Sequence, residues 1–133
     1  MDLHERLRGE LQATAVSDAA WQEFLLKLTD LMGARECVFG GGQGGHTNEL
    51  FAPHSDPDYV TRYLDVYHQQ NDIMRAVADQ GAGAITLADD LPEISDFRRS
   101  DFYNLYCVPQ KFIHALALNL ASSTGWYGTL VIN

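Results

Sequence analysis

An alternation of apolar and polar side chains near the carboxyl end is the feature that most constrains the fold of this chain. Over residues 111–120 large, mostly apolar side chains occupy every second position, and a similar alternation returns over residues 126–132. A period of two is typical of β-strands, because successive side chains of a strand point to opposite faces. The Ser-Ser-Thr-Gly segment between the two runs has the composition of a turn. The pattern therefore predicts a hairpin of two long strands.

Apolar residues at helical spacing predict two helices at the opposite end. A leucine recurs every four residues over 1–16, and a second apolar stripe follows Ser17, a helix-capping residue, and stops at Gly33. Stripes of this kind often pack against a partner helix. We therefore expect the 1–16 helix to contribute to a dimer contact.

Short strands and helices alternate in the middle of the chain. The sequence predicts strands at 36–39, 47–52 and 84–87, and helices at 57–67, 73–78 and 96–107. The glycine-rich segment 40–45 is predicted to be a turn between the first two strands. Because no crossover helix follows every strand, a doubly wound parallel fold is excluded. We therefore predict an α+β fold, with an antiparallel sheet of about five strands and helices on both faces, in one domain over residues 1–133.

The charge balance bears on the partners of the chain. Its 133 residues include 18 Asp and Glu against 9 Lys and Arg, which gives a formal net charge of -9. Nucleic-acid-binding surfaces are basic, so we expect no direct nucleic-acid contact by this segment. No apolar run approaches the roughly 20 residues of a membrane helix, and the first residues lack the layout of a signal peptide. These features predict a cytoplasmic chain without a membrane segment, in which Cys37 and Cys107 are buried thiols.

The sequence motifs give no support to an enzyme. Gly40, Gly42 and Gly45 match the spacing G-x-G-x-x-G, but a strand-like segment follows in place of the helix that would bind a phosphate. The five histidines and two cysteines show no metal-site spacing, and no G-x-S-x-G nucleophile motif occurs. We therefore expect no enzymatic activity, no metal ion and no cofactor.

Aromatic side chains with polar tips are the unusual signal in this sequence. Tyr59, Tyr63 and Tyr67 recur at four-residue intervals, which places their rings on one face of a helix, and Phe102 and Tyr106 lie together on a second helix. Tyrosine combines an apolar body with one hydrogen-bonding group, which suits a pocket for a small molecule. An ordinary aromatic core has the same spacing, so the pattern alone leaves both interpretations open.

The segment from Ser100 to Leu116 reads S-D-F-Y-N-L-Y-C-V-P-Q-K-F-I-H-A-L. It resembles the S-[DE]-F-Y-N … P-x-G-[LI]-x-H-x-[LM] segment in the sensory domains of LuxR-family helix-turn-helix regulators. An early helix that contains Trp21 and the stretch from Tyr63 to Asp72 also resemble this family, so the resemblance covers nearly the whole chain from residue 17. It implies a GAF/PAS-like α/β/α sandwich that senses a ligand. It also implies a DNA-binding helix-turn-helix domain, which is absent from this chain.

Members of this family that bind acyl-homoserine lactones use a Tyr and a Trp four residues apart, and then an Asp before a Pro. By resemblance, Tyr59, Tyr63 and Asp72 fall at these three positions. Tyr63 stands in place of the Trp, Ile73 in place of the Pro, and Lys111 in place of the glycine of the later segment. These differences argue against a lactone and leave the identity of the ligand open.

The resemblance and the aromatic pattern together predict a small-molecule site between the sheet and the helices. Tyr63, Tyr67 and Asp72 would supply polar contacts, and Trp126 would form an apolar wall. The chain would regulate a DNA-binding domain and form a homodimer, and the alternative is a ligand-free dimerisation module with a filled aromatic core. The residues predicted to line the site are Tyr59, Tyr63, Tyr67, Asp72, Phe39, Phe51, Phe102, Tyr106, His114 and Trp126.

Overall fold

The structure is a computed structural model that describes residues 2, 5–6, 9, 18–43, 49–121 and 125–133. The helix predicted over 1–16, its proposed dimer contact and the cap at Ser17 fall on segments that lie outside the described residues, apart from isolated positions. The same is true of the end of the glycine-rich segment and of most of the turn predicted in the final hairpin.

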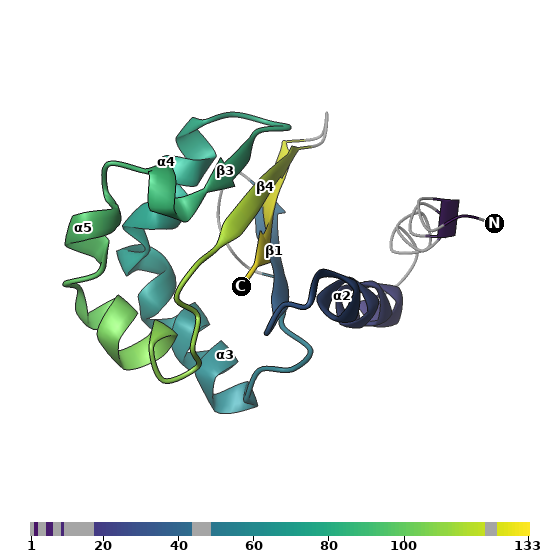
Figure 1. The fold of residues 1–133 in the computed structure, drawn as a ribbon, viewed down its shortest axis with the longest axis horizontal. Coiled ribbons are helices and arrows are strands. Elements are labelled where there is room, and N and C mark those ends of the chain that lie inside the picture. The colour runs from purple at the N-terminus through teal and green to yellow at the C-terminus, as the bar shows by residue number, and fades with distance from the viewer. Residues whose placement is uncertain (1, 3–4, 7–8, 10–17, 44–48, 122–124) are drawn as a thin grey trace.

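A five-stranded antiparallel sheet forms the centre of the fold (Figure 1). The strands follow the order β2-β1-β5-β4-β3, and every neighbouring pair is antiparallel. The predicted α+β fold and the predicted final hairpin are both confirmed. The strands are β1 (Cys37–Gln43), β2 (Glu49–Phe51), β3 (Ile85–Leu87), β4 (Leu116–Ala121) and β5 (Trp126–Ile132).

Helices cover both faces of this sheet. Figure 1 shows α2 (Asp18–Met32) on one side and α3, α4 and α5 on the other. The helical segments of the second side follow one another along the chain as a series of short pieces. They are α3 (Pro57–Asp65), η1 (Tyr67–Gln70), α4 (Asp72–Asp79), η2 (Ala88–Asp90), α5 (Ile94–Phe97) and the π-helical turn η3 (Tyr103–Cys107).

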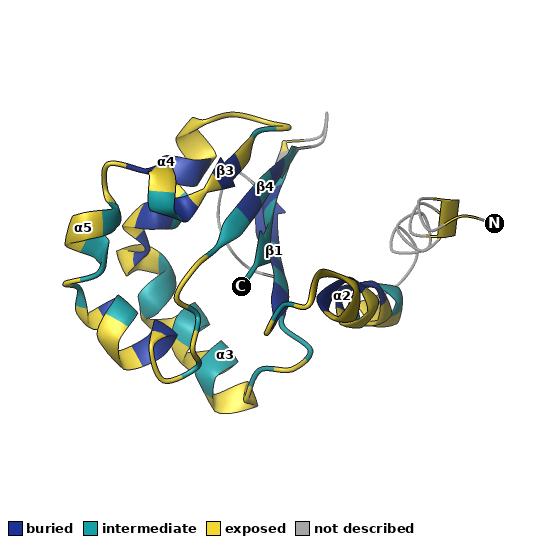
Figure 2. Cartoon of the chain, in the orientation of Figure 1, coloured by how far each residue is buried: buried dark blue, intermediate teal, exposed yellow. Residues whose placement is uncertain are grey.

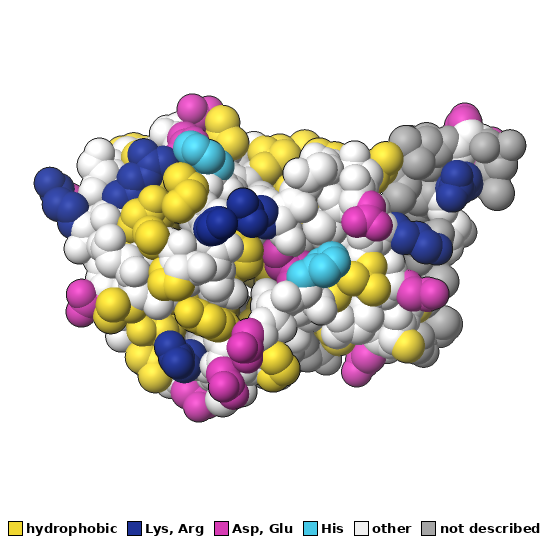
Figure 3. Space-filling model, turned by 60° about the horizontal axis from the view of Figure 1, so that its bottom comes forward, with side chains coloured by type: hydrophobic (Ala, Val, Ile, Leu, Met, Phe, Trp, Pro, Cys, Tyr) yellow, Lys and Arg dark blue, Asp and Glu magenta, His cyan; other side chains and the backbone are white. Residues whose placement is uncertain are grey.

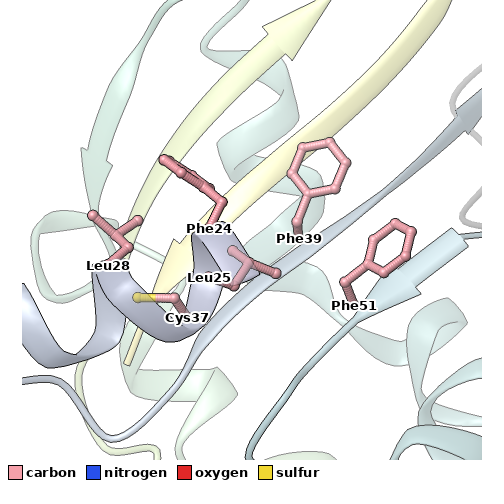
Figure 4. Close-up of a cluster of buried hydrophobic side chains, with 6 residues drawn as sticks. All are labelled: Phe24, Leu25, Leu28, Cys37, Phe39 and Phe51. Atoms are coloured by element: carbon pink, nitrogen blue, oxygen red, sulfur yellow. The ribbon is translucent and has the colours of Figure 1, made fainter. Parts of the chain in front are cut away.

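The face under α2 is closed by a compact apolar cluster (Figure 4). Phe24, Leu25 and Leu28 of α2 are buried against side chains of β1 and β2, at the spacing that puts them on one helix face. Trp21 adds its ring to Phe39, with 4.0 Å between the ring centroids and 13° between the planes. Full burial of each such side chain contributes about 1.5–3 kcal/mol.

The opposite face carries a second cluster under α4. Ile73 and Val77 of this helix are buried against Ala117 of β4, and Figure 2 shows dark blue residues where α4 meets the sheet. Asn119 is fully buried beside them, and its side-chain amide donates hydrogen bonds to the carbonyls of Val77 and Gly81. The end of α4 is therefore fixed to β4 by polar as well as apolar contacts.

The glycines after Phe39 form part of a strand, which corrects the predicted turn. Gly40, Gly41 and Gly42 continue β1, and they pair in register with Thr129, Gly128 and Tyr127 of β5. Backbone hydrogen bonds need no side chain, so a long neighbouring strand can extend the ladder through glycine despite its low strand propensity. Glycine inside a strand often marks a place where another group approaches the backbone closely.

The strand predicted to start at residue 111 starts at Leu116. Lys111 has a left-handed backbone, with φ of 62°, and its amide donates to the carbonyl of Val108. The amide of Phe112 donates to the carbonyl of Cys107 at 2.9 Å. These bonds close the preceding helical turn, so residues 111–115 form a connection, in which Phe112 is half-buried and Ile113 and His114 are exposed.

Two predicted helices are interrupted. The one predicted over 57–67 ends at Val66, whose φ and ψ of −129° and −58° are not helical, and Tyr67 starts η1. The one predicted over 96–107 is divided at Ser100, whose hydroxyl donates to the carbonyl of Phe97 and accepts from the amide of Tyr103. Among the described residues no helix is long and apolar enough to cross a membrane.

Candidate ligand-binding site

A cavity of about 160 Å³ lies between the sheet and the short helices. Its floor is formed by Val38 and Gly40 of β1 and by Thr129 and Val131 of β5, which alternate with the residues that face α2. These four residues are only half-buried although they lie in central strands, because the helices above them leave a space. The other lining residues are Leu50, Ala52, Tyr63, Asn71, Ile73, Met74, Ala88, Ile94, Phe97, Phe102, Tyr106, Cys107, Phe112, Ile113, His114, Ala115 and Asn133.

Aromatic rings form one wall of the cavity. Phe102 and Tyr106 are stacked, with 5.1 Å between their ring centroids and 16° between their planes. The ring of Tyr63 lies 6.0 Å from the first and 5.8 Å from the second. The amide of Val108 donates to the carbonyl of Tyr103, five residues back, which widens the turn η3. Such π-helical turns are frequent at functional sites, and this one presents Tyr106 to the cavity.

The polar groups of the cavity include a fixed pair, Asn71 and Tyr63. Asn71 is buried and caps α4, because its side-chain oxygen accepts from the amide of Met74 at 3.1 Å. Its side-chain nitrogen donates to the phenol oxygen of Tyr63 at 3.2 Å. The capping residue of one helix thus positions the hydroxyl group of another.

Burial keeps the ionisable groups inside the cavity in their neutral forms. Desolvation raises the pKa of Tyr63, against the lowering effect of the hydrogen bond from Asn71. Desolvation also raises the pKa of Tyr106 and that of Cys107, each to about 12. At neutral pH the cavity therefore presents two phenols and a thiol, all protonated.

The cavity reaches the surface beside Ile113 and His114, which are the exposed members of its lining. The Nδ1 atom of His114 lies 2.6 Å from Asp89 Oδ2, and the same carboxylate pairs with Arg98. The side chain of His114 is 69% exposed. The rim of the cavity is therefore formed in part by His114 and the Asp89–Arg98 ion pair. On the face in Figure 3, hydrophobic side chains reach the surface over much of the half of the molecule that contains α3, α4 and α5.

Four of the ten predicted site residues line this cavity: Tyr63, Phe102, Tyr106 and His114. Tyr59 and Tyr67 lie behind the aromatic wall. The ring centroid of Tyr59 is 5.6 Å from that of Tyr106, and the ring centroid of Tyr67 is 5.3 Å from that of Phe102. The structure thus gathers the three tyrosines around one aromatic cluster, although the helix that was predicted to carry them is broken.

The remaining predicted residues are not brought to the cavity. Phe39 and Phe51 face α2 on the other side of the sheet. Asp72 is exposed in the first turn of α4, where it forms an ion pair with Arg75 at 2.7 Å. Trp126 is the first residue of β5, and its side chain lies outside the described part of the chain.

Several lining residues were not predicted, and only one had a sequence signal. Asn71 entered the prediction only as part of the stretch from Tyr63 to Asp72 that resembles the family, although asparagine is a favoured helix cap. Gly40 was assigned to a turn, and Thr129 and Met74 have no local pattern that points to a cavity. Cys107 was predicted to be a buried thiol, and the structure confirms its burial.

A second cavity of about 220 Å³ lies beside the start of β1. The buried carboxylate of Glu36 lines it and accepts from the amides of Cys37 and His54 and from the hydroxyl of Ser55. The Nδ1 atom of His54 lies 3.2 Å from the same carboxylate. Both oxygens of this carboxylate therefore accept hydrogen bonds from protein donors. In the described part of the chain no three His, Cys, Asp or Glu side chains gather in a way that could hold a metal ion.

Comparison with known proteins identifies the fold. No family model and no curated protein sequence matches the chain. The structure of CepR2 from Burkholderia cenocepacia, an N-acylhomoserine lactone-dependent LuxR-family transcription factor, is similar with a TM-score of 0.66 at 17% identity, over 95% of this chain and 74% of that chain. The VqsR ligand-binding domain from Pseudomonas aeruginosa is similar with a TM-score of 0.65 at 17% identity, over 98% of this chain and 78% of that one. Over nearly its whole length, the chain therefore has the fold of the ligand-binding domains of LuxR-family regulators.

Proposed function

We propose that the chain is the small-molecule-sensing domain of a LuxR-type transcriptional regulator. The observation that carries this proposal is the cavity between the sheet and the helices, with its aromatic wall and its positioned Tyr63–Asn71 pair. Ligand sites in proteins combine apolar lining with a few placed polar groups in this way. The similar structures belong to regulators of the same kind.

In this proposal the ligand acts by stabilising one state of the domain. A molecule that binds only the folded, closed arrangement increases its stability by RT ln(1 + [L]/Kd). The lining comes from several separate short helices, so filling the space couples their positions. A DNA-binding helix-turn-helix domain, and a second copy of the chain in a homodimer, would respond to this difference in stability between the two states.

A binding function fits the chemistry of the cavity better than catalysis. An activated cysteine has a lowered pKa, whereas burial raises that of Cys107, and no described residue accepts or donates a hydrogen bond at its sulfur. The alternative of a ligand-free module with a filled aromatic core is disfavoured, because the rings around Phe102 leave a space of about 160 Å³.

Native mass spectrometry of the purified protein, together with thermal-shift measurements over a chemically varied metabolite panel, tests the proposal. We expect a bound small molecule or a rise in melting temperature with at least one compound. The variant Gly40→Val places a side chain in the cavity and should abolish the response while retaining the fold, since Gly40 lies in a paired strand. The absence of any bound molecule and of any shift would contradict ligand sensing.

A further inference from the structure

The hydrogen bonds of Asn71 determine what Tyr63 can offer to a ligand. The oxygen of the Asn71 amide accepts from the backbone amide of Met74, which fixes the orientation of the side chain. Its nitrogen must then donate to the phenol oxygen of Tyr63, as the distance of 3.2 Å shows. The Tyr63 oxygen therefore acts as an acceptor toward Asn71, and its own proton has no acceptor among the described residues.

The absence of charged side chains from the described lining favours a neutral ligand. The described residues around the cavity include no Asp, Glu, Lys or Arg. The phenols and the thiol stay protonated, and His114 at the rim is held by Asp89. A buried ligand charge would have no counter-charge inside the cavity, and burying an unpaired charge is strongly unfavourable.

The size and the walls of the cavity favour a ring. An apolar cavity of about 150 Å³ accommodates benzene, and this cavity has about 160 Å³. The rings of Phe97, Phe102, Tyr106 and Phe112 contribute to its lining. Aromatic side chains at these positions are complementary to another ring, and the volume matches a compact molecule.

We propose that the ligand is a compact, uncharged ring compound whose single hydrogen-bond acceptor is recognised by the hydroxyl group of Tyr63. This inference rests on the proposed function and specifies the chemical class that the same cavity takes. Tyr63 acts as the donor, Asn71 orients it, and the aromatic wall contacts the ring. The acceptor can be a ketone, an amide carbonyl or an ether oxygen, since all three have the required lone pair.

Three probes of nearly equal size separate these requirements. Acetophenone carries a ring and one neutral acceptor, 2-phenylpropene replaces the oxygen by a methylene group, and benzoate replaces the methyl ketone by a charged carboxylate. Each probe is titrated into the isotope-labelled protein, and affinities are read from amide chemical shifts, because this method measures weak binding. We expect saturable binding of acetophenone and binding of benzoate that is at least about tenfold weaker.

The variants Tyr63→Phe and Tyr103→Phe give the matched comparison. Tyr103 packs against Phe97 from outside the cavity lining, so its hydroxyl makes no contact with the ligand in this proposal. We expect Tyr63→Phe to weaken acetophenone about tenfold and to leave 2-phenylpropene unchanged, since one hydrogen bond is lost. Tyr103→Phe should leave both affinities unchanged.

The ligand class is wrong if benzoate binds as tightly as acetophenone, if Tyr63→Phe weakens both neutral probes equally, or if no probe binds. The metabolite panel separates this failure from failure of the proposed function. A charged or long-chain metabolite that binds the protein, and that the Gly40→Val variant excludes, would overturn the ligand class and leave ligand sensing intact. If neither the panel nor the probes bind, both proposals fail.

Discussion

The buried carboxylate of Glu36 connects the start of β1 to the loop that follows β2. It stands immediately before β1, and its partners His54 and Ser55 lie in the loop that follows β2. A buried charge is tolerated only when it is well hydrogen-bonded, and here both carboxylate oxygens accept from protein donors. The residue thus joins two segments at one end of the sheet.

Replacement of Glu36 by glutamine should destabilise the protein by about 3 kcal/mol. The glutamine amide group would turn a donor toward donors that now meet an oxygen, such as the amide of His54. Urea unfolding at neutral pH measures the difference. The same change at the exposed Glu23 of α2 is the control and should alter stability by less than about 0.5 kcal/mol. Equal effects of the two substitutions would show that the Glu36 hydrogen bonds contribute no net stability.

At the scale of elements, Ser100 determines where the helical segment that carries the aromatic wall begins. Its hydroxyl donates to the carbonyl of Phe97 at 2.6 Å and accepts from the amide of Tyr103 at 3.2 Å. The first bond closes the end of α5 and the second caps the segment that leads into η3. One side chain therefore both ends a helix and starts the next.

Ser100→Ala should reduce the free energy of unfolding by about 1 kcal/mol, the usual effect of removing such a cap. Ser95 lies exposed within α5, so Ser95→Ala is the matched control and should be neutral or slightly stabilising. Chemical denaturation of the two variants beside the parent protein provides the measurement. A stability of Ser100→Ala equal to that of the control would contradict a capping role.

The elements that sequence predicted well are those whose pattern arises from local physics. The apolar stripe of α2 and the alternation of β5 follow from burial on one face, and both elements are found where the pattern placed them. The strand through Gly40 and the connection at Lys111 depend on distant hydrogen-bond partners and on backbone conformation. A window of local sequence contains neither of these determinants.

At the scale of the whole molecule, a strand residue lines the cavity only if its side chain lies on the sheet face opposite α2. Both faces are covered by helices, so neighbouring strand residues are apolar on either side. Val38 and Phe39 are both apolar, so the sequence does not indicate which of them faces the cavity. In the structure Val38 lines the cavity and Phe39 packs under α2. Helical spacing does put Tyr59 and Tyr63 on one face of α3, yet only Tyr63 lines the cavity, while Tyr59 packs behind it against Tyr106.

The raised pKa values around the cavity predict a loss of stability at high pH. Burial raises the pKa of Cys107 from 9.0 to about 12 and the pKa of Tyr106 from 10.0 to about 12. A group whose pKa is raised by folding contributes stability that is complete below its unfolded value and disappears as the pH rises through the folded value. The free energy of unfolding should therefore decrease above pH 9 through Cys107 and above pH 10 also through Tyr106, by roughly 1.4 kcal/mol per pH unit for each group.

Urea unfolding at neutral pH and at about pH 11 measures this decrease. The variant Cys107→Val keeps an apolar side chain of similar volume but has no thiol to ionise. We expect its free energy of unfolding to depend less steeply on pH above 9, the value from which the Cys107 pKa rises. The same pH dependence in both proteins would rule out a contribution of Cys107 to alkaline unfolding.

Gly40 is a position where the shape of the cavity can change without a change in the fold. Its backbone pairs with Leu50 on one side and Thr129 on the other, and its φ lies outside the left-handed region that only glycine adopts readily. We expect a β-branched residue such as valine there to keep the strand and to fill part of the cavity from below. If the proposed function holds, a single substitution at this position would change which molecules fit the cavity and would leave the strand pairing of the scaffold in place.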